Sequence, residues 1–133
     1  MTWWRPSRAL ASAQLLQRMG DLSPHFSRSE FKCRHCGRVV GPHPRLVQVL
    51  EAIRALSGRP LVVVSGYRCR VHNNAVGGAA TSQHVVGTAA DIPRGRATVL
   101  QARAAGATGI GHKDGWATHV DVRAGGPSSW EYS

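Results

Sequence analysis

A histidine and an aspartate lie seven residues apart in the stretch SQHVVGTAADI, which runs from Ser82 to Ile92. They are His84 and Asp91, and the aspartate follows two alanines and precedes an isoleucine. Such a run of small apolar residues is typical of a buried strand. An isolated carboxylate is costly there unless it is paired, hydrogen-bonded or bound to a metal. The position of Asp91 therefore indicates a partner for its charge.

The segment THVDV adds a second pair of polar side chains, His119 and Asp121. Residues two apart in a strand point to the same face, so His119 and Asp121 are expected on one face and the neighbouring valines on the opposite face. Three nitrogen or oxygen ligands with an open fourth position are the pattern of a catalytic zinc site. His84, Asp91 and His119 offer such a set, and a zinc ion held by them would lower the pKa of a water toward neutrality. From spacing alone, the alternative is a loop histidine and a turn carboxylate without a metal.

The first half of the chain holds the clearest elements. Apolar residues recur at helical spacing over residues 44–57, with a proline at the start and Ser57-Gly58 at the end, which predicts a helix. The β-branched run that follows predicts a buried strand at 61–65, and GTAADI predicts a second strand over 87–92. The intervening VHNNAVGGAATSQH, residues 71–84, is interpreted as a loop with one helical turn.

The second half is predicted to hold a helix over 96–106 and then a hairpin. Its strands lie near 108–111 and at 117–122, and Lys113-Asp114-Gly115 makes the turn, since Asp-Gly is a strong hairpin signal. A short helix is expected at 8–18, and the tail 124–133 has no periodicity and is expected to be loosely held. These elements predict a small α+β fold, with helices packed on a mainly antiparallel sheet. We expect one domain over residues 1–133, with a core at about 22–123 and peripheral ends.

Composition narrows the possible functions. The chain has 133 residues, which suits one domain, and 17 Lys and Arg against 7 Asp and Glu give a formal charge of +10. The scattered arginines are interpreted either as a solvated basic surface or as attraction to a polyanion, nucleic acid or an anionic cell envelope. No apolar run reaches roughly 18 residues, so no membrane span is expected. The first 20 residues are not a convincing signal peptide, because arginines and glutamines interrupt their apolar residues.

The ordered motifs SGYR, N-x-x-x-GG, S-x-H-x-x-G-x-A-x-D and a final H-x-D resemble the zinc D-Ala-D-Ala carboxypeptidase family. That family also includes peptidoglycan-cleaving phage endolysins, and the likeness is to its compact, single-domain branch. The resemblance covers residues 22–123 and includes HFSRSEFKCRHCG and the helix at 44–57. It implies a hedgehog or D-Ala-D-Ala-peptidase-like fold and a monomeric zinc peptidase acting on bacterial peptidoglycan, as a carboxypeptidase or as an endopeptidase. A phage-type lysin released by a helper, or a virion-associated enzyme, fits the absence of an evident signal peptide.

Position by position, the resemblance implies that His84, Asp91 and His119 are the zinc ligands. Arg68 of SGYR matches an arginine that faces the substrate carbonyl or carboxylate, where a guanidinium can stabilise a developing oxyanion. Ser82 matches a serine near the substrate, although a simple turn hydroxyl is the alternative. Four glycines are expected at turns or close packing contacts: Gly66, Gly77, Gly78 and Gly87.

One position departs from the family pattern. Several relatives carry a glutamate three residues before the last histidine ligand and use it as a general base, whereas this chain has Trp116 there. Asp121 is the first candidate to replace it, as the base or as a group that orients His119. Asp114 and His112 are the alternatives.

The motif CRHCG is a C-x-x-C pair, which can form half of a structural zinc site. Cys69 remains as the third cysteine, and three histidines are further candidate ligands: His25, His35 and His43. The favoured interpretation is nevertheless a pair of thiols on a loop.

Two other functions compete with the peptidase. One is a nucleic-acid-binding zinc module built on Cys33 and Cys36, which would need clustered basic residues, so no nucleic-acid partner is expected. The other is a zinc-stabilised cell-wall-binding domain without catalysis.

Overall fold

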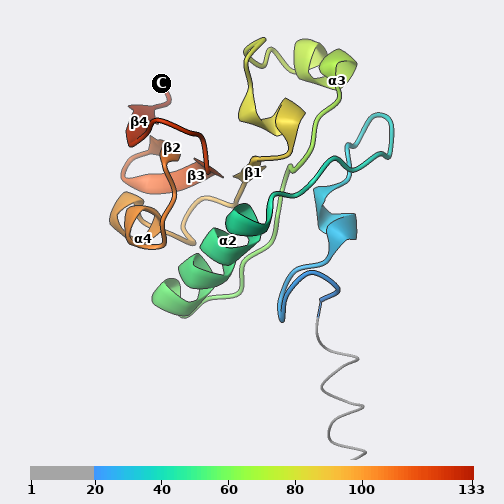
Figure 1. Cartoon of the computed structure of the whole chain (residues 1–133). Helices are drawn as coiled ribbons and strands as arrows, with labels where there is room; N and C mark the ends of the chain where they lie inside the picture. The colour runs from blue at the N-terminus through green and yellow to red at the C-terminus, as the bar shows by residue number, and fades with distance from the viewer. Residues whose placement is uncertain (1–19) are drawn as a thin grey trace, which may run out of the picture.

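The structure is a computed structural model that describes residues 20–133, so the helix expected at 8–18 lies outside the described residues. The four strands form one sheet in the order β1-β3-β2-β4, and helices pack against it (Figure 1). The predicted α+β class is therefore confirmed. The elements in chain order are η1 (Arg28–Phe31), α2 (Pro44–Ser57), α3 (Arg70–Ala75), η2 (Gln83–Val86), β1 (Ala89–Asp91), α4 (Val99–Ala104), β2 (Gly109–Lys113), β3 (Trp116–Asp121) and β4 (Ser128–Glu131).

Helix α2 has the bounds that its sequence predicts. The His43 side chain accepts a hydrogen bond from the Arg45 backbone N–H, and Pro44 occupies the first turn, where its missing N–H is not needed. Gly58 ends the helix in the left-handed conformation, with φ of 67°. One face of α2 is buried, and it consists of Leu46, Val47, Val49, Leu50 and Ile53.

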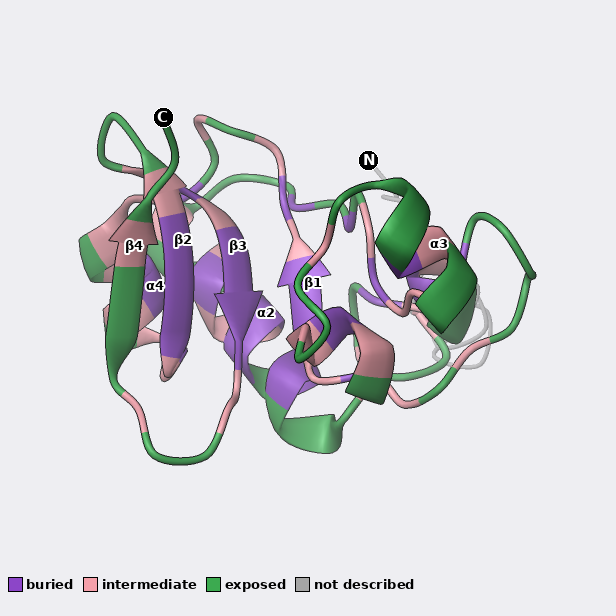
Figure 2. Cartoon of the chain, turned by 90° about the horizontal axis from the view of Figure 1, so that it is seen from above, coloured by how far each residue is buried: buried purple, intermediate pink, exposed green. Residues whose placement is uncertain are grey.

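The hydrophobic core lies between the sheet and the helices α2 and α4, behind the strands in Figure 2. The central strands contribute Ile110 and Val120, both without solvent exposure. Phe26 and Phe31, from the segment before α2, are also fully or almost fully buried in this cluster. The helices thus cover one face of the sheet, and the other face is left for polar side chains.

The sheet is mixed, which corrects the prediction of a mainly antiparallel one. Strand β3 pairs antiparallel with β1 and β2, but β4 runs parallel to β2. The prediction of a loose tail at 124–133 is also wrong in this part, because residues 128–131 form β4. The backbone N–H groups of Ser128 and Tyr132 donate to Thr108 and His112 on the β2 edge, at 2.7 Å and 2.8 Å. The strand is mostly exposed, so no alternation of apolar residues marks it in the sequence.

Residues 61–65 do not form the predicted buried strand. They run extended beside the end of β1, held by a backbone hydrogen bond from Val64 to the Asp91 carbonyl and one from Asp91 to the Ser65 carbonyl, both 2.8 Å. Leu61 and Val63 are buried, whereas Val62 and Val64 are about half exposed. Because β1 is only three residues long, it offers too few partners for a ladder.

The hairpin and the second helix are close to their predictions. Strands β2 and β3 are joined through Asp114 and Gly115, which have φ of 52° and 83°, as a tight hairpin turn requires. Helix α4 is shorter than expected, because Thr98 caps it and forms a reciprocal pair of hydrogen bonds with Gln101. Among residues 20–133, no helix has the length and apolar character that a membrane crossing needs.

Replacing Leu50 by alanine should lower the free energy of unfolding by about 2–5 kcal/mol, because the side chain is fully buried and its loss leaves a cavity. Leu56→Ala, on the half-exposed side of the same helix, is the matched control and should change stability far less. Urea denaturation of both variants measures the difference. Equal losses would contradict the packing of α2 described above.

Candidate metal centre

The strand register places four residues in one row across the open face of the sheet. Asp91 on β1 lies opposite His119 on β3, His119 lies opposite Gly111 on β2, and Gly111 lies opposite Trp130 on β4. Directly opposed residues point to the same face of a sheet. A chain that places a carboxylate, an imidazole and an indole in one row therefore gathers them on the face that the helices leave uncovered.

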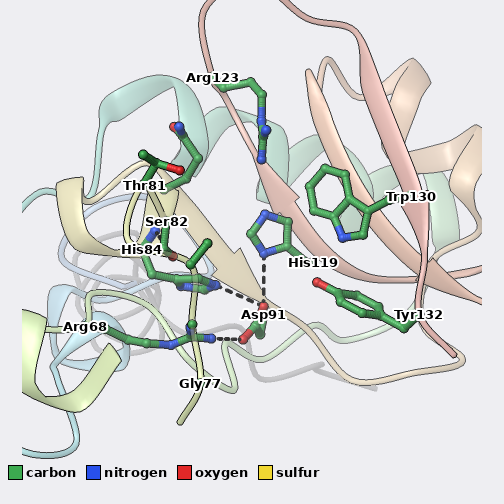
Figure 3. Close-up of a pocket in the computed structure, with 13 residues that line it drawn as sticks. Arg68, Gly77, Thr81, Ser82, His84, Asp91, His119, Arg123, Trp130 and Tyr132 are labelled. Atoms are coloured by element: carbon green, nitrogen blue, oxygen red, sulfur yellow. Dashed lines mark hydrogen bonds and ion pairs between the residues drawn. The ribbon is translucent and has the colours of Figure 1, made fainter. Parts of the chain in front are cut away.

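Three potential ligand atoms meet at the end of this row. His84 Nε2 lies 3.1 Å from Asp91 Oδ1, and His119 Nδ1 lies 3.2 Å from the same oxygen (Figure 3). One nitrogen or oxygen from each of His84, Asp91 and His119 lies within 4.8 Å of the other two. Two imidazoles and one carboxylate are a donor set that zinc binds, with a fourth position left for water or substrate. The structure thus brings together the three residues predicted as ligands, and their role as ligands stays a prediction.

His84 is held in the orientation that metal binding needs. It lies on η2 and is almost fully buried, and its Nδ1 is 2.7 Å from the Gly66 carbonyl. A carbonyl only accepts, so Nδ1 carries a proton, and Nε2 is the nitrogen that faces Asp91 and would coordinate a metal. Ser82 caps η2 by accepting a hydrogen bond from the His84 backbone N–H at 3.2 Å. A Cβ at Gly66 would lie 2.6 Å from the Phe31 Cα, so this position requires glycine.

His119 is oriented from the other side by Asp121. The Nε2 atom of His119 lies 2.8 Å from Asp121 Oδ2, which leaves Nδ1 to face Asp91. Asp121 is fully buried, and it also accepts hydrogen bonds from the side chain and the backbone N–H of Arg123. Both of its oxygens are therefore engaged, and neither faces the pocket. This arrangement favours Asp121 as the group that orients His119 over Asp121 as the general base.

Both carboxylates are held in the ionised state. Burial raises the pKa of Asp91, but hydrogen bonds from His119 and His84 outweigh it and bring the pKa below its ordinary range. Burial likewise raises the pKa of Asp121, but hydrogen bonds from His119 and Arg123 outweigh burial and bring this pKa below its ordinary range. Burial lowers the pKa of His119, but Asp121 and Asp91 raise it above its ordinary value. The centre therefore attracts positive charge, which a bound cation would supply.

Arg68 contacts the free oxygen of the same aspartate. Its guanidinium lies 2.8 Å from Asp91 Oδ2 and 3.3 Å from the side-chain oxygen of Asn73. Asn73 is buried, and its amide nitrogen donates to the Ala79 carbonyl at 2.8 Å, which fixes the Gly77-Gly78 turn. A Cβ at Gly78 would lie 2.0 Å from the Asn73 side chain. Asn73 of the N-x-x-x-GG motif thus holds the Arg68 guanidinium, which in turn contacts Asp91.

A pocket of about 440 Å³ opens over the ligand atoms. Arg68 and Ser82 line it, as the resemblance implies, together with the Gly77–Ala79 turn. Five further lining residues were missed from the sequence: Thr81, Gln83, Arg123, Trp130 and Tyr132. The signal that could have found the two aromatic residues is their spacing of two, which places both on one face of a strand.

Two glycines on β2 make room for these side chains. A Cβ at Gly111 would lie 2.6 Å from the Tyr132 ring and 2.8 Å from the Trp130 indole nitrogen. A Cβ at Gly109 would lie 2.2 Å from Asp121 Oδ1. The Trp130 ring packs on His119 at 5.2 Å between centroids, and the Arg123 guanidinium lies 4.9 Å from the Trp130 ring centroid. The last strand is therefore a wall of the pocket.

Neither Trp116 nor the two alternative candidates for the general base, Asp114 and His112, lines the pocket. Trp116 lies at the start of β3 and contacts a different hollow near Arg59 and Thr98. Asp114 is in the hairpin turn and pairs with Arg94, and His112 follows an irregularity in the β2–β3 pairing. Asp91 is the one carboxylate among the lining residues within the described part of the chain.

A family model described as Peptidase M15 matches residues 24–121. The chain belongs to this family. No curated protein sequence matches the chain. Members of the M15 family are metallopeptidases and depend on zinc in general, and the His84, Asp91 and His119 donor set fits that metal. The resemblance seen in the sequence motifs is thereby confirmed at the level of the family.

Changing Asp121 to asparagine should weaken zinc binding by about 10–100-fold, because the variant loses the charged partner that orients His119. Calorimetric titration of the metal-free protein measures this. Asp114→Asn, a carboxylate in the exposed hairpin turn, is the matched control. An unchanged zinc affinity combined with a large fall in kcat would instead indicate that Asp121 is the general base.

Proposed function

We propose that this M15 chain is a zinc peptidase that cleaves the stem peptides or cross-links of bacterial peptidoglycan. The observation that carries the proposal is the convergence of His84 Nε2, Asp91 Oδ1 and His119 Nδ1 at one end of an open pocket in a chain of this family. The peptidoglycan substrate is supported by the resemblance of the motifs to D-Ala-D-Ala carboxypeptidases. The net charge of +10 supports adsorption to an anionic cell wall.

A zinc ion bound by the three ligands would activate a water and polarise the scissile carbonyl. Arg68 is fixed by Asp91 and Asn73 at the pocket wall, so its guanidinium stands where a negative oxygen develops as the amide is attacked. The position of this positive charge is set before substrate arrives, because both partners of Arg68 are themselves held by the fold. Arg68 thus both steadies the Asp91 carboxylate and offers donors to the substrate.

Proton transfer to the leaving amine needs a group that faces the pocket, and the family's glutamate is replaced by Trp116. Tyr132 lies at the pocket wall with its hydroxyl directed to the pocket interior (Figure 3). A phenol can donate a proton to a developing amine. We assign this step to the Tyr132 hydroxyl, with the Trp130 ring and Arg123 forming the adjoining wall.

Purified peptidoglycan incubated with the zinc-loaded protein should lose turbidity and release peptide fragments with new chain ends. His84→Ala and chelated wild type should release nothing, and zinc added back to the chelated protein should restore release. His25→Ala is the matched histidine control, because His25 pairs with Glu51 outside the pocket. Mass spectrometry of the fragments then separates carboxypeptidase from endopeptidase activity. Zinc-loaded, folded protein that binds the wall and releases nothing would contradict the proposal and favour a cell-wall-binding domain.

Replacing Tyr132 by phenylalanine should lower kcat by about 100-fold or more while KM stays nearly constant, because proton transfer by a positioned group typically contributes that much. The change removes one oxygen atom and keeps the ring beside Gly111. Tyr67→Phe is the matched control, since Tyr67 does not line the pocket. Wild-type kcat in Tyr132→Phe would overturn the assignment of this step.

A further inference from the structure

A second cluster of metal-binding side chains lies outside the pocket. The sulfur atoms of Cys33, Cys36 and Cys69 lie within 4.8 Å of one another. Cys33 and Cys36 come from the loop after η1, and Cys69 comes from the start of α3, more than thirty residues later. The sequence interpretation of two thiols on a loop is therefore incomplete, because the fold adds the third cysteine.

The loop of Cys33 and Cys36 is closed by backbone hydrogen bonds. The Cys33 N–H donates to the Arg38 carbonyl at 2.8 Å, and Gly37 turns the chain with φ of 72°. The Cys69 backbone N–H lies 3.4 Å from Cys33 Sγ, and the His72 backbone N–H lies 3.4 Å from Cys69 Sγ. N–H groups that point at sulfur stabilise thiolates, which are the form that binds metal.

The charges of the cluster also favour a cation. Three thiolates at this separation would repel one another, and a divalent ion removes that repulsion. A disulfide would join only two of the three sulfurs and leave the third without a role.

We propose that Cys33, Cys36 and Cys69 bind a second, structural zinc ion. Thiolates are the ligands that structural zinc sites use most, and such sites are nearly always four-coordinate. Two imidazoles come from the same two segments as the cysteines. The rings of His35, inside the C-x-x-C loop, and of His72, three residues after Cys69, stack at 6.3 Å between centroids. A rotation of one of these side chains supplies the fourth ligand.

The consequence of this zinc is to fix the segment that carries Arg68. Residues 61–69 lie outside the sheet and are held by a few backbone hydrogen bonds, which join Val64 and Ser65 to Asp91, Tyr67 to Phe31 and Arg68 to His84. Cys69 directly follows Arg68, whose guanidinium contacts Asp91 Oδ2. A metal that joins Cys69 to the loop at 33–36 therefore holds Arg68 in place against the pocket.

Cobalt substitution tests the site without any variant, because sulfur-to-cobalt charge transfer gives a near-ultraviolet band that histidine and carboxylate ligands do not give. The wild-type protein, reduced and then loaded with cobalt, should show this band, and His84→Ala should keep it. Cys36→Ser, a change at an exposed cysteine, should lose most of it. Wild-type protein that lacks the band after reduction would overturn the proposal.

Zinc content and thermal stability give a second measurement. Wild type should hold about two zinc ions per chain, and His84→Ala and Cys36→Ser about one each. Zinc should still raise the Tm of His84→Ala, since a ligand that binds only the folded state stabilises it, and this rise should vanish in the double variant. His35→Ala and His72→Ala identify the fourth ligand by the larger loss of zinc affinity. Cysteines that resist thiol reagents in unfolded, unreduced protein would reveal a disulfide instead and contradict the metal site.

Discussion

The carboxylate of Asp91 is the point at which the separate parts of this protein meet. Its Oδ1 atom faces the imidazoles of His84 and His119, and its Oδ2 atom accepts from Arg68. Its backbone bonds at the same time to the segment before Arg68 and, through β1, to β3. A charge placed among small apolar residues is tolerated because each of its oxygens has a positively charged or polar partner.

One face of the sheet packs into the hydrophobic core, and the other face carries the candidate metal ligands Asp91 and His119. Ala90, Val120 and Ile110 form a row on the helix-covered face and are fully buried. Their neighbours along each strand point to the opposite face, where Asp91 and His119 stand. This face can hold a polar site only because the adjoining strand carries glycines, whose missing side chains leave space for the buried Asp121 and for Trp130 and Tyr132. The polar face thus depends on the packing of the apolar one.

Orientation of the ligands comes from a backbone carbonyl and a buried carboxylate that do not line the pocket. The Gly66 carbonyl fixes the His84 ring, and the buried Asp121 carboxylate fixes the His119 ring. Arg123 completes this chain of contacts, since it neutralises Asp121 and also lies against Trp130. An arrangement of this kind sets which nitrogen of each histidine faces Asp91 before a metal arrives, so that binding requires little reorganisation of the rings.

The sequence alone determined the elements whose causes are local. The helix at 44–57 was predicted with correct ends, because Pro44 and Gly58 act through their own backbone conformations. The hairpin followed from Asp114 and Gly115 in the same way. The alternation of His119 and Asp121 with valines also predicted that the two side chains share a face, and the structure places them in contact.

The tertiary structure decided what depends on pairing between distant segments. Strand β4 carries no apolar alternation, because it is held mainly by backbone hydrogen bonds to the edge of β2, and a side-chain pattern does not record these. Trp130 and Tyr132 reach the pocket only through that pairing. The gathering of Cys69 with Cys33 and Cys36, and the inward burial of Asp121, likewise arise from contacts that no local window of sequence contains. Local conformational preferences depend on each residue and its neighbours in sequence, whereas the pairing of distant segments is determined only when the whole chain packs.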